Sequence, residues 1–413
     1  MHDDALSGPR GTSSGPTSLP GWQILFEARG QQLLAEVEAA LESGTSELTL
    51  GARLRADHLA GDEVAALLNQ AALRRKARVK FGDRARQLLF TQAGLEQASR
   101  AEVAALHAQR FAAADCRLVA DLGCGIGTES IALLDSGVRT LAVEIDPFTA
   151  QIAAHNLAQL HEGAQVVVGD ASEVALDGVQ GVFLDPARRT AGHRNTKRLT
   201  RPDDYSPSLG FVFDVATRHA TGVKLGPGFD RELIPATAEA QWVSVNGQVV
   251  ETALWFGAVA RPEVRRAALV LRDGTAHELT AAHDSPDTDV RGLGEFLYEP
   301  DGAVIRARLI GKLAEQLGAA MVSDHIAYLT ADTLVDTPFA QAFRVVEQLP
   351  ASEKQLKRAL AARGIGTLEI KKRGADVDPA ALRTRLRLKG PNSATLFLTR
   401  VAGRHAALLA ERV

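Results

Sequence analysis

A glycine-rich segment, Asp121-Leu-Gly-Cys-Gly-Ile-Gly-Thr128, follows a short apolar run and precedes a predicted helix. Glycines let a ligand approach the backbone closely and supply unusual dihedral angles, while a helix N-terminus offers free N–H groups. A dinucleotide site needs the spacing G-x-G-x-x-G so that a pyrophosphate can sit on the helix. The third such position after Gly123 and Gly125 is Thr128 here, so the spacing disfavours a dinucleotide.

Three more segments that could do chemistry lie at the ends of predicted strands. Glu144 stands 23 residues after Asp121, where a carboxylate can accept hydrogen bonds from both ribose hydroxyls. Gly169-Asp170-Ala171 ends the next strand, and Asp185-Pro186-Ala187-Arg188 ends the one after it. The carboxyl ends of parallel strands line the ligand crevice of an open α/β sheet, so we expect these residues at one site.

Alternating strands and helices are predicted to position these segments. The predicted strands cover 117–122, 139–146, 165–170, 181–185 and 221–225, with further strands around 242–272. Helices are predicted from Glu129, over 147–160 and over 208–219. Regular alternation indicates an α/β fold with a parallel, doubly wound sheet, and the strands suffice for seven.

With DLGCGIG, AVEID, GDA and LDPAR as successive motifs, residues 115–260 resemble the class I S-adenosylmethionine-dependent methyltransferases. The resemblance implies a Rossmann-like seven-stranded sheet and S-adenosylmethionine as the cofactor. The residues implied to hold its methionine end are Asp121 and the backbone of Gly123, Gly125 and Gly127. By the same resemblance Glu144 would hold the ribose, and Asp170 with Ala171 would hold the adenine.

The LDPAR motif lies where the methyl group should point. Methyl transfer is an in-line displacement, so the protein must align the acceptor with the sulfonium and, where needed, accept a proton. Asp185, with Pro186, is therefore the catalytic candidate. Family members that methylate exocyclic base amines carry Asp-Pro-Pro-aromatic, whereas Ala187 and Arg188 fill the last two positions here, which puts amine methylation in doubt.

Two other acceptor chemistries make different demands on the sequence. Methylation of uracil C5 needs a cysteine nucleophile near the substrate. Cys116 precedes the first strand and Cys124 lies in the glycine loop, so this chemistry is disfavoured. Methylation of a ribose 2′-oxygen would use a lysine and carboxylates, and Asp185, Lys224 and Glu251 occupy suitable strand ends.

Residues 187–201 carry cations and no acid. The cations are Arg188, Arg189, Arg194, Lys197, Arg198 and Arg201. Arg binds phosphate bidentately and also stacks on bases. We interpret the loop as a clamp that positions RNA beside the methyl donor, with contacts from Arg188, Arg189, Lys197 and Arg198. The alternatives are a solvated loop, or pairing of Arg188 with Asp185.

The C-terminal part is strongly basic. Residues 344–413 hold 15 Lys and Arg against six Asp and Glu, a net charge of +9, so the rest carries −12 of the total −3. Clustered cations attract a phosphate backbone. One predicted strand end carries Lys371, Lys372 and Arg373, which we take as RNA contacts. A second row of cations is predicted on one extended face, at the alternate positions Arg383, Arg385, Arg387 and Lys389. The alternative is that these residues only solvate an edge strand.

The same tail is predicted as a small α+β module: a helix (352–363), a strand (368–374), a short helix after Pro379 and two strands. It resembles the THUMP-like C-terminal module of a group of uncharacterised class I methyltransferases. THUMP modules proper occur on RNA-modifying enzymes, so the resemblance implies RNA as a partner, most simply transfer or ribosomal RNA.

We expect five segments: a disordered leader (1–20), a helical region (21–112), the methyltransferase domain (113–275), a connecting region (276–343) with a helix from about 303 to 317, and the THUMP-like domain (344–413). Hydrophobic residues at 46% and charged residues at 23% are typical of a globular protein. Apolar runs are too short for a membrane span. The two cysteines are too few for a disulfide framework or zinc site, which favours the cytoplasm and no metal.

The leading hypothesis is therefore a methyltransferase that acts on RNA. One alternative is a methyltransferase for a protein or small molecule. The other is a non-catalytic RNA-binding scaffold that binds S-adenosylmethionine.

Overall fold

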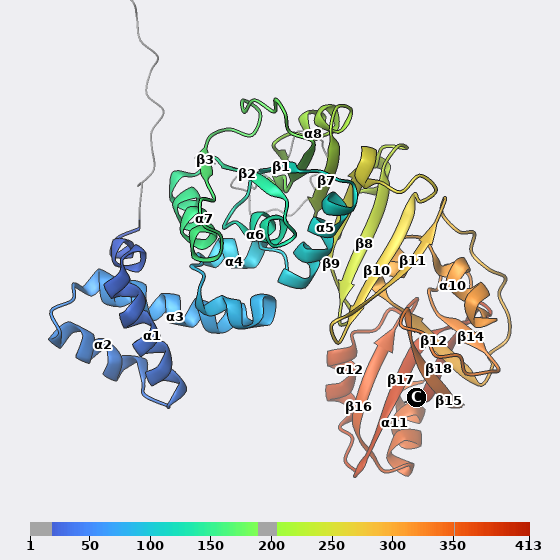
Figure 1. The fold of residues 1–413 in the computed structure, drawn as a ribbon. Coiled ribbons are helices and arrows are strands. Elements are labelled where there is room, and N and C mark those ends of the chain that lie inside the picture. The colour runs from blue at the N-terminus through green and yellow to red at the C-terminus, as the bar shows by residue number, and fades with distance from the viewer. Residues whose placement is uncertain (1–18, 189–204, 351) are drawn as a thin grey trace, which may run out of the picture. The chain divides into compact units, whose positions relative to one another are not determined.

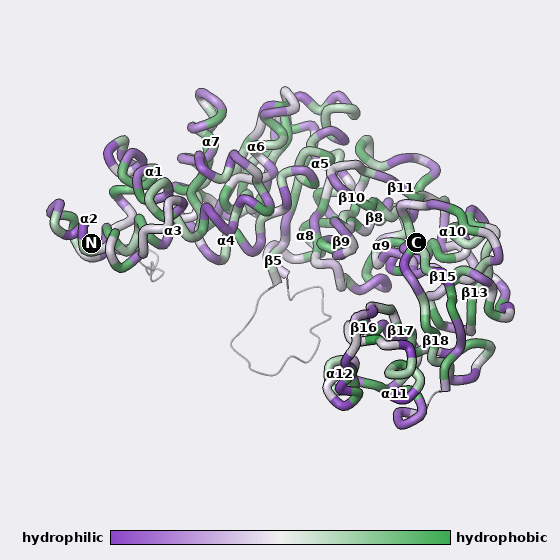
Figure 2. Tube along the Cα trace, turned by 90° about the horizontal axis from the view of Figure 1, so that it is seen from below, coloured by the Kyte–Doolittle hydropathy of each residue, from purple (hydrophilic) through white to green (hydrophobic). Residues whose placement is uncertain are grey.

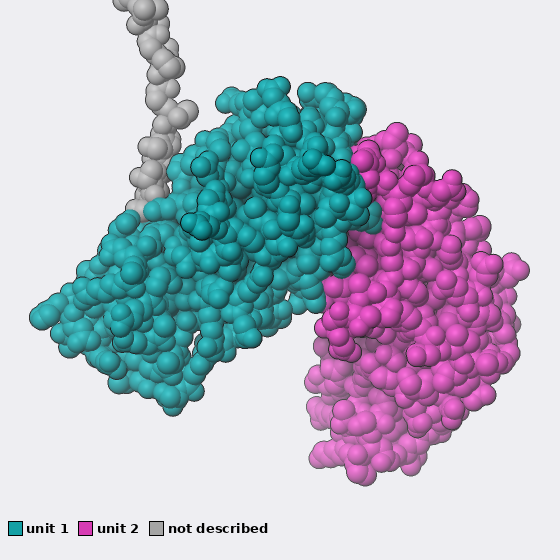
Figure 3. Space-filling view, viewed as in Figure 1, with its two compact units in different colours: residues 1–222 teal, residues 223–413 magenta. Residues whose placement is uncertain are grey.

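The computed structural model describes residues 19–188, 205–350 and 352–413 (Figure 1). Most of the predicted leader lies outside these ranges. The chain divides into two compact units, residues 1–222 and 223–413 (Figure 3).

The first unit begins with the helical region that the sequence predicted. Its elements are η1 (Trp22–Phe26), α1 (Ala28–Glu42), α2 (Glu47–Ala56), α3 (Gly61–Phe81), η2 (Gly82–Arg86), α4 (Gln92–Gln97) and α5 (Ala101–Ala113). Ser46 and Thr91 accept hydrogen bonds from backbone N–H groups in the first turns of α2 and α4, which explains where these helices start. Arg74 is buried on α3, where it donates to the carbonyl oxygen of Leu88 at 2.8 Å and pairs with Glu38.

A parallel sheet follows in the same unit. Its strands are β1 (Leu118–Leu122), β2 (Arg139–Glu144), β3 (Val166–Val168) and β4 (Gly181–Leu184), in the order β3-β2-β1-β4. The helices between and after them are α6 (Thr128–Asp135), α7 (Pro147–Leu160) and α8 (Leu209–Ala216). Val119, Ala120 and Leu122 of β1 are fully buried, as expected for a central strand covered on both faces.

Further strands complete this sheet. They are β7 (Ala220–Leu225), β8 (Glu239–Val245), β9 (Gln248–Phe256), β10 (Arg266–Arg272) and β11 (Thr275–Ala281), with the 3₁₀ turns η4 (Arg231–Leu233) and η5 (Gly257–Val259). The strand order is β11-β10-β8-β9-β7-β4-β1-β2-β3, and β7 contains the boundary between the two units. Seven strands were predicted, and the sheet has nine because the β10–β11 hairpin extends it.

A second sheet lies in residues 223–413. Its elements are β12 (Phe296–Pro300), α9 (Gly302–Arg306), α10 (Ile310–Leu317), β13 (Ala320–Met321), β14 (Leu329–Ala331), β15 (Ala340–Leu349), α11 (Glu353–Ala362), β16 (Ile365–Lys372), α12 (Pro379–Leu386), β17 (Asn392–Val401) and β18 (Arg404–Arg412). The strand order is β13-β14-β12-β15-β18-β17-β16. One face packs on α11 and α12 through leucines and isoleucines, and the other has an aromatic cluster with Tyr328, Phe343 and Phe397.

Two local predictions in this part were wrong. The helix predicted over 303–317 is two helices, because Arg308 has a left-handed φ of 59° that ends the first. Arg383 and Arg385 lie in α12, and Arg387 follows it in a left-handed conformation. The row of cations at alternate positions therefore does not lie on an extended face.

Two short strands flank the basic loop. β5 (Ala187–Arg188) pairs antiparallel with β6 (Tyr205–Ser206), and Tyr205 is buried. Residues 189–204, which connect these strands, lie outside the described ranges.

Candidate active site

The glycine loop joins β1 to α6 and is held against the neighbouring strand. The backbone N–H groups of Gly123 and Cys124 both donate to the carbonyl oxygen of Val143 at 2.9 Å. Gly127 has a φ of 89°, and a Cβ there would lie 2.4 Å from Cδ1 of Leu157. Gly125 has a φ of 56°, and a Cβ there would meet nothing within 4 Å. Gly127 therefore permits close packing on α7, whereas the space beside Gly125 is open to a ligand.

Glu144, at the end of β2, is bound to this loop. Its Oε2 accepts a hydrogen bond from Gly125 N–H at 3.0 Å, and its Oε1 accepts one from Asp146 N–H at 2.9 Å. Asp146 in turn caps α7, because its side chain accepts from Thr149 N–H at 2.8 Å. A carboxylate has about four acceptor positions, so capacity remains for two ribose hydroxyls.

Asp121 lies beneath the loop and is 1% exposed. Its Oδ2 accepts a hydrogen bond from the Ser130 hydroxyl at 2.6 Å. Its pKa is raised to about 7, mainly by burial and also by the nearby acids Glu129 and Asp185, against the hydrogen bonds from Ser130, which lower it. Near neutral pH this carboxyl is poised between its two protonation states.

The third predicted site segment, Gly169-Asp170-Ala171, lies after β3. Asp170 is exposed, and its Oδ1 accepts hydrogen bonds from Ser172 N–H at 2.8 Å and from the Ser172 hydroxyl at 2.6 Å. Ala171 is half-buried. Sequence reasoning missed two apolar side chains at these strand ends, Ile145 beside Glu144 and Val168 at the end of β3, which are 63% and 54% exposed. Apolar residues directly beside the polar motif residues were the available signal.

The fourth predicted site segment, Asp185-Pro186-Ala187-Arg188, follows β4, and its first residue lies close to the glycine loop. A Cβ on Gly123 would lie 3.9 Å from the backbone carbonyl oxygen of Asp185. Asp185 also raises the pKa of Asp121, which places the two carboxyls in one electrostatic environment. Pro186 is buried, and the chain then enters the β5–β6 pair.

The N-terminal helical region supports the glycine loop directly. Asn156 of α7 is fully buried, accepts from Leu89 N–H at 2.7 Å, and donates to the carbonyl oxygens of Leu89 and Ile126 at 3.0 Å. A Cβ on Gly94 of α4 would lie 2.5 Å from the Ile126 side chain. Because Ile126 belongs to the glycine loop, the segment from Leu89 to Gly94 fixes one side of that loop.

This support continues through a shared core. A single apolar cluster joins residues of η1, α1, α2 and α3 with residues of the glycine loop, α6 and α7. Trp22 packs edge-on against Phe148 with ring centroids 5.0 Å apart, and Phe26 packs edge-on against His155. The helical region is therefore built into the candidate site.

Comparison with known proteins identifies the family. Two proteins from Mycobacterium tuberculosis, strains CDC 1551 / Oshkosh and H37Rv, are each 37% identical to this chain over 350 residues, 83% of this chain and 94% of theirs. Both bear the name uncharacterized S-adenosylmethionine-dependent methyltransferase. The chain belongs to this methyltransferase family. The predicted enzyme class and cofactor are thereby confirmed.

Other comparisons cover the parts of the methyltransferase. The family described as THUMP domain-like matches residues 340–412, as the tail predicted. A family described as a domain of unknown function, DUF8688, matches residues 19–77. A crystal structure of a candidate methyltransferase from Porphyromonas gingivalis W83 has a TM-score of 0.71 and 21% identity, covering 92% of this chain and 98% of that one. The two proteins share a fold.

The cysteines of the methyltransferase are buried and unreactive in character. Burial raises the pKa of the Cys116 thiol, and burial beside Asp121 and Glu144 raises that of Cys124 well above its usual value. Lys224 and Glu251, the candidates for ribose methylation, are buried in β7 and β9. Within the described residues, three or more metal-ligating side chains do not cluster, and no helix is long and apolar enough to cross a membrane.

Some of the predicted RNA-contact residues lie within the described ranges and others do not. Arg189, Lys197 and Arg198 lie outside the described residues, and of Arg188 only the backbone, in β5, is described. Lys371 is bound by two acids, with Nζ 2.6 Å from Oε2 of Glu299 and 3.3 Å from Oε1 of Glu369. Lys372 is exposed.

Arg373, the last of the predicted contacts, is half-buried, and its guanidinium lies over the ring of Tyr328, 5.2 Å from the centroid. Of the strand-end cluster, Lys372 is therefore the cation presented most openly to solvent.

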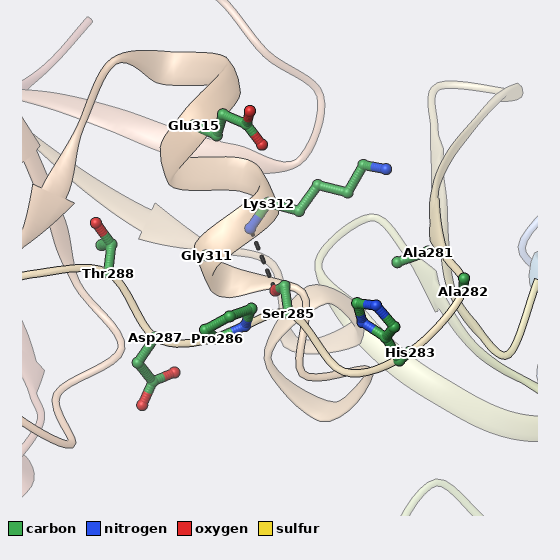
Figure 4. A pocket seen from close by; sticks show the side chains of 10 residues that line it. All are labelled: Ala281, Ala282, His283, Ser285, Pro286, Asp287, Thr288, Gly311, Lys312 and Glu315. Carbon is green, nitrogen blue, oxygen red and sulfur yellow. Dashed lines mark hydrogen bonds between the residues drawn. The ribbon is translucent and has the colours of Figure 1, made fainter.

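A pocket of about 490 Å³ lies elsewhere in the methyltransferase, beside the N-terminus of α10 (Figure 4). Ser285 accepts a hydrogen bond there from Lys312 N–H at 3.2 Å, and His283 and Glu315 also line it. None of the residues that line this pocket belongs to the glycine loop or to the three other predicted site segments, so the pocket is not the predicted cofactor site.

Proposed function

We propose that this methyltransferase transfers the methyl group of S-adenosylmethionine to RNA. The observation that carries the RNA acceptor is the THUMP domain-like match over residues 340–412, a segment of net charge +9. Nucleic acid binding is governed by cations that neutralise backbone phosphates, and a basic module on an otherwise acidic chain favours such a ligand.

The open loop around Gly125 fits the cofactor. In this proposal Asp121 and the backbone of Gly123, Gly125 and Gly127 hold the methionine end. Glu144 holds the ribose through its remaining acceptor positions. Asp170 and Ala171 bind the adenine edge, while the exposed Ile145 and Val168 side chains supply apolar surface for the base.

Asp185 and Pro186 act at the reacting end. S-adenosylmethionine supplies an electrophilic methyl group on a sulfonium sulfur. The Asp185 carboxylate accepts a hydrogen bond from the N–H or O–H of the acceptor and orients its lone pair toward the methyl carbon. As the new bond to carbon forms and the carbon–sulfur bond breaks, this carboxylate takes up the proton that the acceptor loses. Pro186, because it is buried, fixes the backbone that presents Asp185.

RNA would be bound by cations of the basic loop and of the C-terminal module. We propose Arg188, Arg189, Lys197 and Arg198 of the basic loop as phosphate contacts. Lys371, Lys372 and Arg373 were proposed for the same role. Glu299 and Glu369 already compensate the charge of Lys371, so we expect Lys371 to contribute less to phosphate binding than an unpaired cation would.

The test is a labelling experiment with methyl-labelled S-adenosylmethionine and RNA from a strain lacking the gene. The unaltered enzyme should label one nucleoside, resolved by mass spectrometry after digestion. Asp185→Ala should abolish labelling and leave cofactor affinity within about threefold, a change of less than ~1 kcal/mol. Asp214→Asn, an exposed acid on α8, is the matched control and should remain active.

Cofactor binding without any labelled nucleoside would overturn the RNA acceptor. Label in protein or in a small molecule from the same extract would assign the acceptor to that class instead. Full activity of Asp185→Ala would overturn the role of Asp185 while leaving the acceptor in place.

A further inference from the structure

The charge of the C-terminal module is unevenly compensated. Several of its cations lie within 4 Å of an acidic oxygen. These pairs are Arg344 with Glu295, Arg363 with Glu347, Lys371 with Glu299 and Glu369, Arg385 with Glu353, and Arg412 with Glu369. Such pairs leave little net charge at their positions, so the basic character of the module resides in its other cations.

Five of those other cations lie on or directly after the two helices of the module. Lys354, Lys357 and Arg358 lie on α11, and Arg387 and Lys389 follow α12 directly. All five are exposed, and within the described ranges none has an acidic partner within 4 Å. We call these five residues the α11–α12 cation surface.

The two helices are adjacent, so these cations belong to one surface. Arg385 Nε of α12 lies 3.1 Å from Oε1 of Glu353 on α11, and Lys357 Nζ lies 3.5 Å from the carbonyl oxygen of Arg385. Figure 2 shows α11 and α12 side by side.

The opposite sides of the helices pack on the sheet. Leu356 and Leu360 of α11, and Leu382 and Leu386 of α12, are buried in the core that covers β16, β17 and β18. The side chains at 354, 357 and 358 are exposed whereas these leucines are buried, so the cations project away from this core. The surface is thus held on a rigid support.

We propose that the α11–α12 cation surface binds the phosphate backbone of RNA. The inference rests on the proposed function for its choice of polyanion, and it adds where on the module the RNA lies. Uncompensated cations spaced over two adjacent helices can each neutralise a phosphate and release its counterion. The strand-end cluster predicted from the sequence cannot do so to the same degree, because Lys371 is already paired.

The charge reversal Lys354→Glu together with Arg358→Glu tests this surface. The readout is the affinity of the full-length protein for bulk transfer RNA at several salt concentrations. We expect at least a tenfold loss of affinity. The slope of log K against log salt concentration should fall in magnitude by about 1.4 to 1.8, since each of the two lost phosphate contacts removes about 0.7 to 0.9.

Arg404→Glu is the matched control. Arg404 is an exposed cation at the β17–β18 turn of the same module, and the adjacent Gly403 N–H contacts Ser323 rather than either helix. This variant should keep both the affinity and the salt dependence. A milder pair, Lys354→Gln with Lys357→Gln, should give an intermediate loss, and unchanged thermal unfolding establishes that each variant is folded.

The outcomes separate this proposal from the proposed function. If the unaltered protein binds transfer RNA and the reversed variant binds it equally well, the surface is wrong and the RNA acceptor stands. If the unaltered protein does not bind transfer RNA at all, the proposal for this surface is overturned, whereas the labelling experiment still decides whether RNA is the acceptor. If the charge-reversed variant keeps its RNA affinity but loses binding to anionic phospholipid vesicles, the surface binds membranes instead, and the proposal that it binds RNA is overturned.

Discussion

The carboxylate of Glu144 accepts a hydrogen bond from the Gly125 backbone N–H at 3.0 Å. This bond joins the end of β2 to the middle of the glycine loop, and the second carboxylate oxygen joins β2 to the start of α7 through Asp146 N–H. Glu144 therefore has a role in shaping the loop in addition to its proposed contact with the ribose.

A substitution at Glu144 tests both of these roles through the affinity for the cofactor. Glu144→Ala removes the acceptor for both N–H groups and for the ribose, so we expect the affinity for S-adenosylmethionine to fall about 10- to 100-fold, as for hydrogen bonds to a charged group. Titration calorimetry measures this. Glu162→Ala, an exposed acid just after α7, should bind the cofactor normally, and equal affinity in both variants would contradict the assignment.

The pKa of Asp121, raised to about 7 by burial, predicts a pH-dependent cofactor affinity. The sulfonium and amino groups of the cofactor are positive and favour the ionised carboxylate. Binding should therefore tighten as the pH rises from about 6 to 8, and Asp121→Asn should flatten this dependence. An unaltered pH profile in the variant would show that another group is responsible.

The same shift predicts an effect on stability. The folded protein binds more protons at Asp121 than the unfolded chain does between about pH 4 and pH 7, so the free energy of unfolding falls as the pH rises through this range. The contribution is at most about 1.4 kcal/mol per pH unit. In urea unfolding without cofactor, Asp121→Asn should lack this contribution.

Asn156 should be critical for both stability and cofactor binding. Asn156→Ala leaves the N–H of Leu89 and the carbonyl oxygens of Leu89 and Ile126 without their buried partner, which should cost roughly 3 to 5 kcal/mol. Gln159→Ala, on the exposed side of the same helix, should cost less than ~0.5 kcal/mol in the same urea titration. A small effect at Asn156 would mean that the helical region does not hold the loop.

We expect the packing of the helical region on α7 to be sensitive to acid because of His155. Burial, together with repulsion from Arg74, lowers its pKa to about 4, so the folded protein holds the neutral ring beside Phe26. The stability it contributes is complete above pH 6.5 and is lost as the pH falls toward 4, by about 1 to 3 kcal/mol. His155→Leu should unfold with less dependence on pH over this range, whereas His405→Gln, at an exposed position, should follow the unaltered protein.

The strands and helices of the catalytic fold were predictable because their signals are local. Buried runs such as 118–122 and the Pro147 start of α7 depend on apolar residues and caps that can be read in order. The split between α9 and α10 was not predictable, because Arg308 adopts a left-handed conformation that its residue type does not favour. The β10–β11 hairpin was only partly anticipated, since seven strands were expected with the last of them around 242–272, and β11 lies beyond that range.

The candidate site was predictable as a set of strand ends, but its connections were not. The motif spacing indicates Glu144 and Asp121, whereas the bonds from Gly125 and Ser130 depend on where loops meet. The contact of Asn156 with Leu89 spans 67 residues and has no sequence signal in one chain. The pairing of Lys371 with Glu299, 72 residues away, was missed for the same reason, so charge counting alone overestimated that cluster.

The ten-residue strand β15 joins two parts of the chain that sequence comparison separates. The THUMP domain-like match begins at its first residue, Ala340, yet β15 pairs on one side with β18 inside the match and on the other with β12, which precedes it. A fragment cut at residue 340 would leave the β12-facing edge of β15 bare, an open template for intermolecular pairing. In this enzyme the matched module shares one continuous sheet with the strands that precede it, so transferring the module to another protein would require β12, β13 and β14 to be transferred as well.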